Sequence, residues 1–149
     1  MRGARWWIGR TAAGMALLTP LTAGAHETRH KGLEMVHPWT FETAAAGASE
    51  IVRMRIHNHA NAADRLMAAS SAAAERVEVV GGDGAAGAIV LPAGATVALG
   101  RDGPHLVLVG LTRRLTAYQE VPLTLHLETA GEVTVQVMVE ERPAPPAAR

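Results

Sequence analysis

The sequence of 149 residues contains no cysteine, few aromatic residues and no net charge. The absence of thiols excludes a disulfide framework, thiolate metal sites, iron–sulfur clusters and cysteine nucleophiles. Aromatic residues form only 3% of the chain, so a pocket that stacks rings or bases is not expected. Lys and Arg together number 14, as do Asp and Glu, whereas a protein that tracks phosphates needs a basic face. We therefore expect no nucleic-acid partner.

The common catalytic motifs are missing as well. The sequence has no GxSxG nucleophile turn, no GxxxxGKS phosphate loop and no HExxH zinc pair. Its glycine-rich segment 81–84 lies between expected strands rather than before a helix, which indicates a flexible turn rather than an anion site. Because the carboxylates also show no visible pairing, we predict that the protein is not an enzyme.

Residues 1–25 have the pattern of an export signal. Three arginines lie within the first ten residues, a weakly apolar stretch covers 8–23, and Ala23-Gly24-Ala25 has the small–x–small form of a cleavage site. The apolar stretch is short and is interrupted by Gly14 and Pro20, so a cleaved signal is favoured over a retained anchor. A cysteine-free exported chain suits the periplasm, and no membrane contact is expected after cleavage.

Short strands separated by turns fill the chain after residue 25. Residues 50–58 alternate between apolar and polar side chains, as a half-buried strand does. Residues 121–128 and 132–139 alternate in the same way around a glycine turn, which predicts a hairpin. The expected strands are 33–39, 50–58, 75–80, 88–91, 96–99, 105–109, 121–128 and 132–139.

No long segment has a helical period, although the alanine-rich segments 44–48 and 68–74 could each hold a helical turn. The pattern predicts an all-β domain at 26–142, built as an antiparallel Greek-key barrel or sandwich. A flexible tail rich in proline and alanine is expected at 143–149.

All seven histidines lie after the expected cleavage site, and they are the residues best suited to carry chemistry. Cleavage after Ala25 makes His26 the first residue, where the terminal amine and the imidazole can chelate one metal ion together. A second histidine would complete a three-nitrogen histidine brace, an arrangement that favours Cu(II). His30 is close enough along the chain to contribute. The alternative is that 26–31 is a disordered polar leader.

The remaining histidines lie on or beside expected strands. His57 and His59 are two residues apart and project from one face, where they can hold a metal or be plain outward residues. His105 follows a Gly-Pro turn at the mouth of a strand, where a ligand would be exposed and well positioned. We interpret His37 as a strand-edge residue and His126 as an outward, solvated residue.

Several segments form an ordered set that runs through nearly the whole mature chain. They are Ala25-His26-Glu27 with Leu33-Glu34 and His37-Pro38-Trp39, Ile56-His57-Asn58-His59 with Ala63-Asp64-Arg65-Leu66, Ala73-Ala74 with Val77-Glu78, Leu91-Pro92-Ala93-Gly94, Gly103-Pro104-His105-Leu106, Gly110-Leu111 and Val121-Pro122-Leu123-Thr124-Leu125. The order and spacing of this set over 33–139 resemble the periplasmic copper chaperone family PCuAC, also called DUF461. The resemblance implies a cupredoxin-like β-barrel that carries copper in the periplasm. It also implies a copper-acceptor protein, such as a cytochrome oxidase assembly factor.

Most copper ligands that the resemblance implies are absent. The family pattern has a His shortly after the Val-Glu pair, a Met further on, and His-x-Met on a hairpin. Here Val80 stands at the first position, 84–91 contains no Met, and Val107 replaces the hairpin Met. Only His105 remains, so the usual thioether site for Cu(I) is lost, and nitrogen ligands favour Cu(II).

Three hypotheses follow. The one we adopt is a periplasmic copper carrier with a remodelled, His-based Cu(II) site that uses His26 and His105, with His30 and Asp102 as further candidate ligands. The second is a metal-free relative that acts as a protein-interaction domain in copper handling. The third is a brace-type copper oxidase, which is weakest because few aromatic residues remain to form a substrate surface.

The export signal gives a first testable prediction. Mass spectrometry of the exported protein should show a mature chain that begins at His26, because the signal is cleaved after Ala25. A mature chain that still carried Trp6 and Trp7 would contradict both the cleavage site and the amine ligand.

Overall fold

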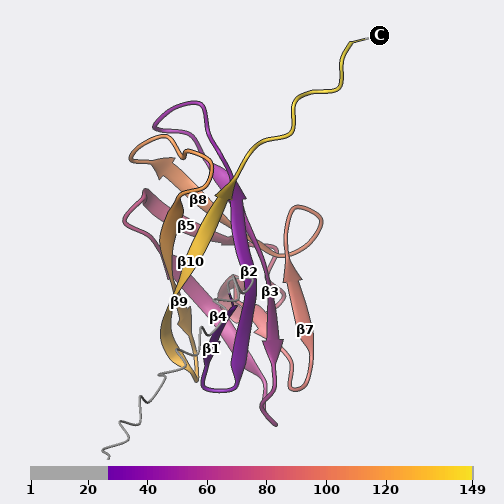
Figure 1. Ribbon diagram of the computed structural model, residues 1–149. Coiled ribbons are helices and arrows are strands. Elements are labelled where there is room, and N and C mark those ends of the chain that lie inside the picture. Colours follow the sequence, from indigo (N-terminus) through magenta and orange to yellow (C-terminus); the bar gives the residue numbers. More distant parts are fainter. Residues whose placement is uncertain (1–26, 149) are drawn as a thin grey trace, which may run out of the picture.

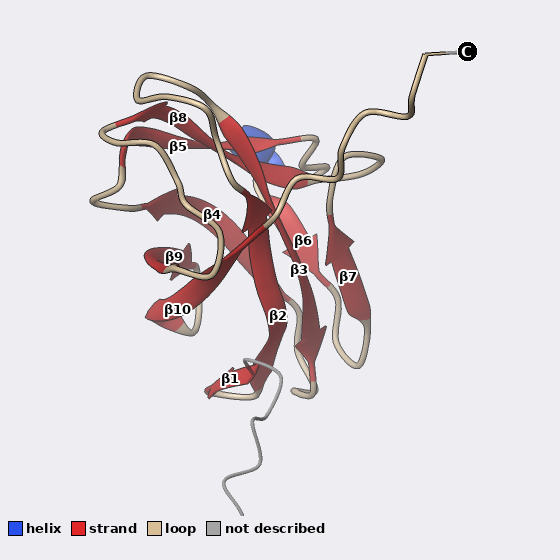
Figure 2. Cartoon of the chain, turned by 45° about the horizontal axis from the view of Figure 1, so that its top comes forward, coloured by secondary structure: helices blue, strands red, loops and turns tan. Residues whose placement is uncertain are grey.

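The computed structural model describes residues 27–148 as ten β-strands and one 3-10 turn. The strands are β1 (Glu27–His30), β2 (Leu33–Phe41), β3 (Glu50–Asn58), β4 (Asp64–Ser70), β5 (Ala74–Val80), β6 (Ile89–Leu91), β7 (Thr96–Leu99), β8 (His105–Leu111), β9 (Glu120–Leu127) and β10 (Gly131–Glu140). The 3-10 turn, η1 (Ala85–Gly87), is blue in Figure 2. Among the described residues, no helix has the length and hydrophobicity that a membrane crossing needs. The expected signal at 1–25 and His26 lie outside the described part of the chain, so the cleavage site stays a prediction.

Seven strands close into a barrel. Their order around it is β2-β10-β9-β4-β5-β8-β3, and β3 pairs with β2 to complete the circle. All neighbours are antiparallel except β10 and β2, which run in parallel (Figure 1). β1 extends the edge of β2, β7 extends the edge of β3, and β6 pairs with β4. The prediction of an all-β Greek-key barrel is confirmed.

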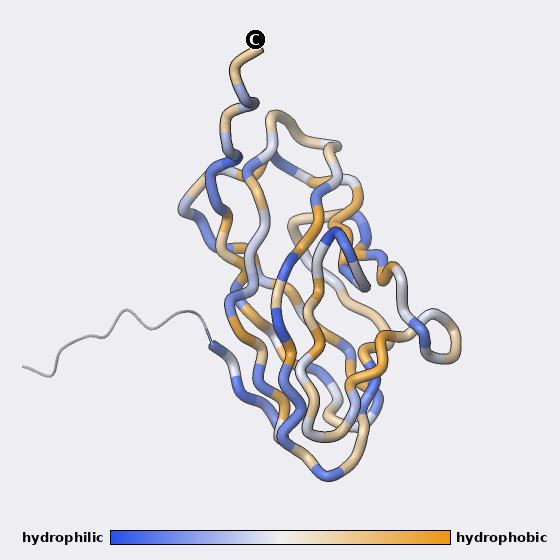
Figure 3. Tube along the Cα trace, turned by 90° about the vertical axis from the view of Figure 1, so that its right-hand side faces the viewer, coloured by the Kyte–Doolittle hydropathy of each residue, from blue (hydrophilic) through white to orange (hydrophobic). Residues whose placement is uncertain are grey.

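Alternating side chains fill the barrel with aliphatic groups. Val52, Met54 and Ile56 of β3 are buried, as their period of two predicts. In the predicted hairpin of β9 and β10, Leu125 lies opposite Val133, and both point into the core. Figure 3 shows the same alternation of hydrophobic and hydrophilic residues along the strands. The three aromatic residues of the described chain lie outside this core.

Two buried polar residues tie together the loops at one end of the barrel. Asn58, which is 1% exposed, donates from Nδ2 to the carbonyl of Leu91 in β6 at 3.0 Å. The carboxylate of Asp64 accepts the backbone N–H groups of Thr129 and Ala130, at 2.9 and 3.0 Å, in the turn between β9 and β10. Both belong to segments that carry the family resemblance. Their partners show that these segments maintain the fold, because buried polar groups must be hydrogen-bonded.

The two expected helical turns are not helical. The segment 68–74 contains the end of β4, a turn and the start of β5, and 44–48 lies in the loop between β2 and β3. Alanine favours helices in isolation. Here Ala69, Ala73 and Ala74 are buried in the barrel core, so tertiary packing overrides their local preference.

β4 and β1 are strands that the sequence did not predict. In β4 the register with β9 shifts between Leu66 and Ala68, and this irregularity hides the alternation. β1 is only four residues long, and it forms by antiparallel pairing with the first half of β2. Residues 27–30 are therefore a strand rather than part of a disordered leader.

The β9–β10 hairpin gives a stability prediction. Leu125→Asp places an unpaired carboxylate at a fully buried position, so it should lower the free energy of unfolding by roughly 3 kcal/mol or more. Urea unfolding followed by far-UV circular dichroism measures the change. Gln136→Asp, on the outward face of β10, is the matched control and should cost about 1 kcal/mol or less. Parent-like stability of Leu125→Asp would contradict the inward face assigned to β9.

Candidate functional site

His105 opens β8 on the outer face of the barrel. Val80 of β5 lies opposite it, and Val107 lies opposite Glu78 in the same strand pair. The leucines of β8 alternate into the core, so His105 and Val107 point outward. The His105 ring places Nδ1 2.8 Å from the carbonyl oxygen of Gly103. Since a carbonyl can only accept, Nδ1–H is the donor, and Nε2 keeps a lone pair in the neutral ring.

The structure brings together the positions where the resemblance places ligands. Val80 is opposite His105, and Val107 follows two residues later on β8, so one histidine and two valines occupy this surface. β5 and β3 are the strands that pair with β8. No methionine of the described residues lies on β5 or β8 beside His105: Met35 and Met54 are buried in the core, Met67 is exposed on β4, and Met138 lies on β10.

The other predicted ligands lie elsewhere on the barrel. His26 is outside the described residues, and the strand that follows it, β1, is separated from β8 by β2 and β3. His30, at the end of β1, places Nε2 2.9 Å from the carbonyl oxygen of Ala130. Asp102 lies in the loop that leads into β8. Of the further candidates, Asp102 is thus three residues from His105 along the chain, whereas His30 is separated from it by β2 and β3.

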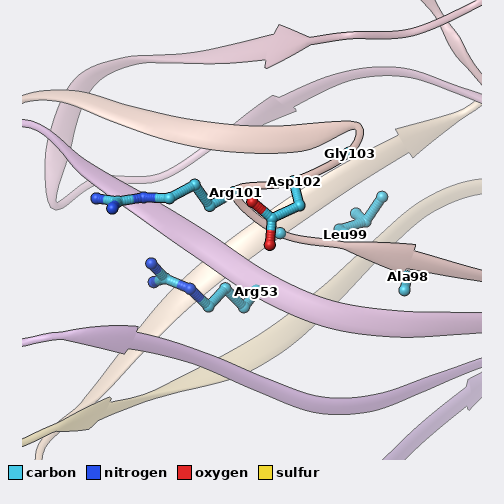
Figure 4. A pocket seen from close by; sticks show the side chains of 7 residues that line it. Arg53, Ala98, Leu99, Arg101, Asp102 and Gly103 are labelled. Carbon is cyan, nitrogen blue, oxygen red and sulfur yellow. The ribbon is translucent and has the colours of Figure 1, made fainter.

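An open groove of about 450 Å³ runs beside the loop between β7 and β8 (Figure 4). Arg53 of β3 and Arg101 of the loop extend in the same direction there, and Asp102 lies in the same wall. The Arg53 guanidinium also lies over two rings, 4.7 Å from the centre of Trp39 and 4.9 Å from the centre of Phe41. Two cations, a carboxylate and an aromatic pair suit a charged or polar partner better than a bare metal ion.

His57 and His59 form a close pair at the end of β3. Their ring centres are 4.1 Å apart, with the ring planes at 65°. Nδ1 of His57 lies 2.5 Å from Oγ1 of Thr96 in β7, and Nε2 of His59 lies 2.5 Å from Oε2 of Glu34 in β2. The predicted projection from one face is confirmed. The two oxygen partners come from neighbouring strands, which no pattern in the sequence identified.

An ion-paired row connects this histidine pair to β1. Arg29 of β1 contacts Glu27 at 2.8 Å and Glu34 at 3.1 Å, and Glu34 lies between Arg29 and His57 in the strand register. Hydrogen bonds from His59 and Arg29 lower the pKa of Glu34 to about 2. The Glu34 carboxylate is therefore ionised at neutral pH, and charge as well as backbone pairing holds β1 to the barrel.

The two remaining histidines each contact a glutamate. His37, with a φ of 50°, lies at a bulge in β2, 3.2 Å from Glu140. His126 faces outward as predicted, with Nδ1 3.0 Å from Glu132 and Nε2 3.2 Å from Ser70. These contacts tie His126 to both neighbouring strands rather than leaving it fully solvated. Within residues 27–148 no group of three His, Asp or Glu side chains is placed to hold a metal ion.

Comparison with known families identifies the barrel. A family model matches residues 33–139, from the start of β2 nearly to the end of β10, and its description is "LpqE-like: Putative lipoprotein LpqE-like". The chain belongs to the LpqE-like family. The resemblance to PCuAC domains is confirmed as well, because PCuAC domains are among the solved structures with a similar fold. No curated protein matches the chain.

Three solved structures show the likeness in detail. The apo PCuAC domain from PmoF1 is 23% identical, with a TM-score of 0.73 over 78% of this LpqE-like chain and all of the domain. The copper-bound PCuAC domain from PmoF2 is 28% identical, with a TM-score of 0.71 over 78% of this chain and 99% of the domain. The Cu(I) form of DR1885 from Deinococcus radiodurans is 23% identical, with a TM-score of 0.57 over 79% of this chain and 83% of that protein. The cupredoxin-like fold expected from the sequence is confirmed.

The lowered pKa of Glu34 predicts how stability depends on pH. Its folded pKa is about 2 against an ordinary value of 4.5. Ionised Glu34 therefore stabilises the fold above about pH 4.5, and this contribution is lost as the pH falls through about 2. Urea unfolding of the parent and of Glu34→Gln across this range should show their difference in unfolding free energy shrinking toward acid. A difference that stays constant with pH would contradict the assignment.

Proposed function

We propose that the chain is an exported copper carrier, which holds copper as cargo and passes it to an acceptor protein such as a cytochrome oxidase assembly factor. The likeness to a copper-bound PCuAC domain supports copper as the ion. The family description, which names lipoproteins, supports export. Within the structure, the proposal depends on His105, which keeps a family ligand position on the outer face of β8.

We assign the site to Cu(II) with nitrogen ligands. Val80 and Val107 offer only methyl groups beside His105, so the soft ligands that Cu(I) prefers are not supplied there. His105 offers Nε2, and His26 offers an imidazole and, after cleavage, the terminal amine. Asp102, on the loop before β8, adds a carboxylate as a further candidate ligand. Each imidazole must be neutral, and the amine must lose its proton, before either can bind.

This site requires β1 to leave β2. Neighbouring strands lie about 4.8 Å apart, and Leu33 pairs with Asn58 whereas Leu106 pairs with Val52, so the path from Leu33 to His105 runs across β3 and about five residues along it, roughly 19 Å in all. The segment 26–32 reaches about 20 Å when extended, which lets His26 arrive if the chain pivots at Leu33. β1 suits this role, because it has four residues and its side chains are exposed or half-buried. Its release would also free His30 from Ala130 as another candidate ligand.

A second candidate function is that of a metal-free interaction domain in copper handling. The groove beside the β7–β8 loop favours it, since Arg53 and Arg101 would attract acidic groups there. An oxidase is not proposed, because Trp39 and Phe41 lie beneath the Arg53 guanidinium rather than forming a free aromatic surface.

Electron paramagnetic resonance during Cu(II) titration tests the carrier function. The mature parent should bind one Cu(II) tightly per chain, with a nitrogen-rich signal. His26→Ala should weaken binding by about tenfold or more, since the terminal amine loses the imidazole with which it chelates the ion. His105→Ala should do the same. His126→Ala is the control and should bind as the parent does, because His126 lies on β9 with its own partners.

The same Cu(II) titration predicts a pH dependence, and two of its possible results would contradict the carrier function. Binding should fade below about pH 6, near the ordinary histidine pKa, as the nitrogen ligands become protonated. Parent-like binding by both His26→Ala and His105→Ala would place the tight site elsewhere. A parent that binds no Cu(II) tightly would leave the metal-free interaction domain as the function.

A further inference from the structure

The His57–His59 pair takes no part in the copper site proposed above. It lies where β3 meets β2 and β7, whereas His105 opens β8. Each ring uses one nitrogen in a contact with an oxygen and keeps the other nitrogen free within the described residues. Two imidazole nitrogens on one face are therefore left that the fold itself does not use.

We propose that His57 and His59 form a second metal site, independent of His26 and His105, for a divalent ion of the zinc, copper and nickel class. Imidazole nitrogen suits these ions. Nε2 of His57 and Nδ1 of His59 are the ligand atoms, and water completes the coordination. The site thus needs two protein ligands and no third carboxylate or histidine.

The oxygen partners determine which nitrogen of each ring carries the proton and which keeps a lone pair for a metal ion. When Nε2–H of His59 donates to the Glu34 carboxylate, Nδ1 keeps the lone pair. When Nδ1–H of His57 donates to Thr96, Nε2 keeps the lone pair in the same way. Metal-binding histidines usually hold an outer oxygen partner of this kind, which fixes the tautomer and the ring orientation. Glu34 and Thr96 are positioning residues in this site.

The separation of the rings fits one shared ion. An imidazole nitrogen binds at about 2.0–2.1 Å, which places the centres of two adjacent imidazole ligands roughly 4.5–5 Å apart. The observed 4.1 Å needs an opening of less than about 1 Å. His59 lies just beyond the end of β3, and its side chain is 51% exposed, so it can rotate to admit an ion.

The surrounding charge does not oppose a cation. Glu27 and Glu34 contribute two negative charges beside the pair, and Arg29, which is bound to both, contributes one positive charge. Arg55, two residues before His57 on the same face, is exposed to solvent, which screens its charge. An ion can therefore approach from solvent on the side of His59.

Zn(II) titration followed by NMR of the imidazole nitrogens tests the proposal. The experiment uses the mature chain with His26→Ala and His105→Ala, so both histidine ligands of the proposed copper site are already lost. We expect the 15N shifts of His57 Nε2 and His59 Nδ1 to move on adding Zn(II). Further replacement by His57→Ala or His59→Ala should weaken Zn(II) binding by about tenfold or more.

His126→Ala in the same background is the matched control and should leave Zn(II) affinity unchanged. His59→Ala is the decisive variant should His57→Ala fail to fold, because residue 59 lies outside the strand. Equal shifts at His30, His37 or His126, or Zn(II) affinity unaffected by His59→Ala, would overturn the proposal. A failed Cu(II) site at His26 and His105 would not affect this result, since both are disabled in the tested chain.

Discussion

The barrel depends on one strand, β2, that changes its partner halfway along. Its first half pairs with β1, its second half pairs in parallel with β10, and β3 runs along its other edge. The change falls at a bulge, where His37 has a φ of 50° and Pro38 has no N–H to donate. Beyond the bulge, β10 pairs with the same edge of β2 that β1 pairs with before it. Closure of the sheet therefore rests on a local irregularity of two residues.

Closure also decides which outward side chains meet. Arg29, Glu34, His57 and Thr96 come from four strands, and the lateral order of those strands places them in one row. The pairing of β5 with β8 sets His105 opposite Val80 in the same manner. Because aliphatic side chains fill the interior, the chemistry of this protein is confined to such rows on its outer face.

The regular strands were predictable from the sequence because their burial alternates without interruption. Residues 50–58 form β3 with the expected bounds, and the final hairpin differs from its prediction by one residue at its ends. β4 was missed because its register shift breaks the pattern, and β1 was missed because it exists only through its pairing with β2. A sequence pattern encodes which face a side chain takes, but not how the strands are ordered around a barrel.

The same limit applies to the candidate site. The shared face of His57 and His59 follows from their spacing, whereas Glu34 and Thr96 are brought to them only by the lateral strand order. The surroundings of His105 likewise depend on where β5 lies. The resemblance to PCuAC domains supplied the positions of the lost ligands, since no periodicity in this chain marks them. The pairing of His26 with His105 stays a prediction.

Trp39 has a consequence for how this molecule can be observed. It is the one tryptophan of the sequence beyond residue 25, and it lies opposite Arg53 across the β2–β3 pairing, with the guanidinium over its ring. Its fluorescence therefore reports a surface contact next to the bulge and does not report packing in the aliphatic interior. A change in that emission marks the opening of the seam between β2 and β3, the event at which the barrel becomes an open sheet.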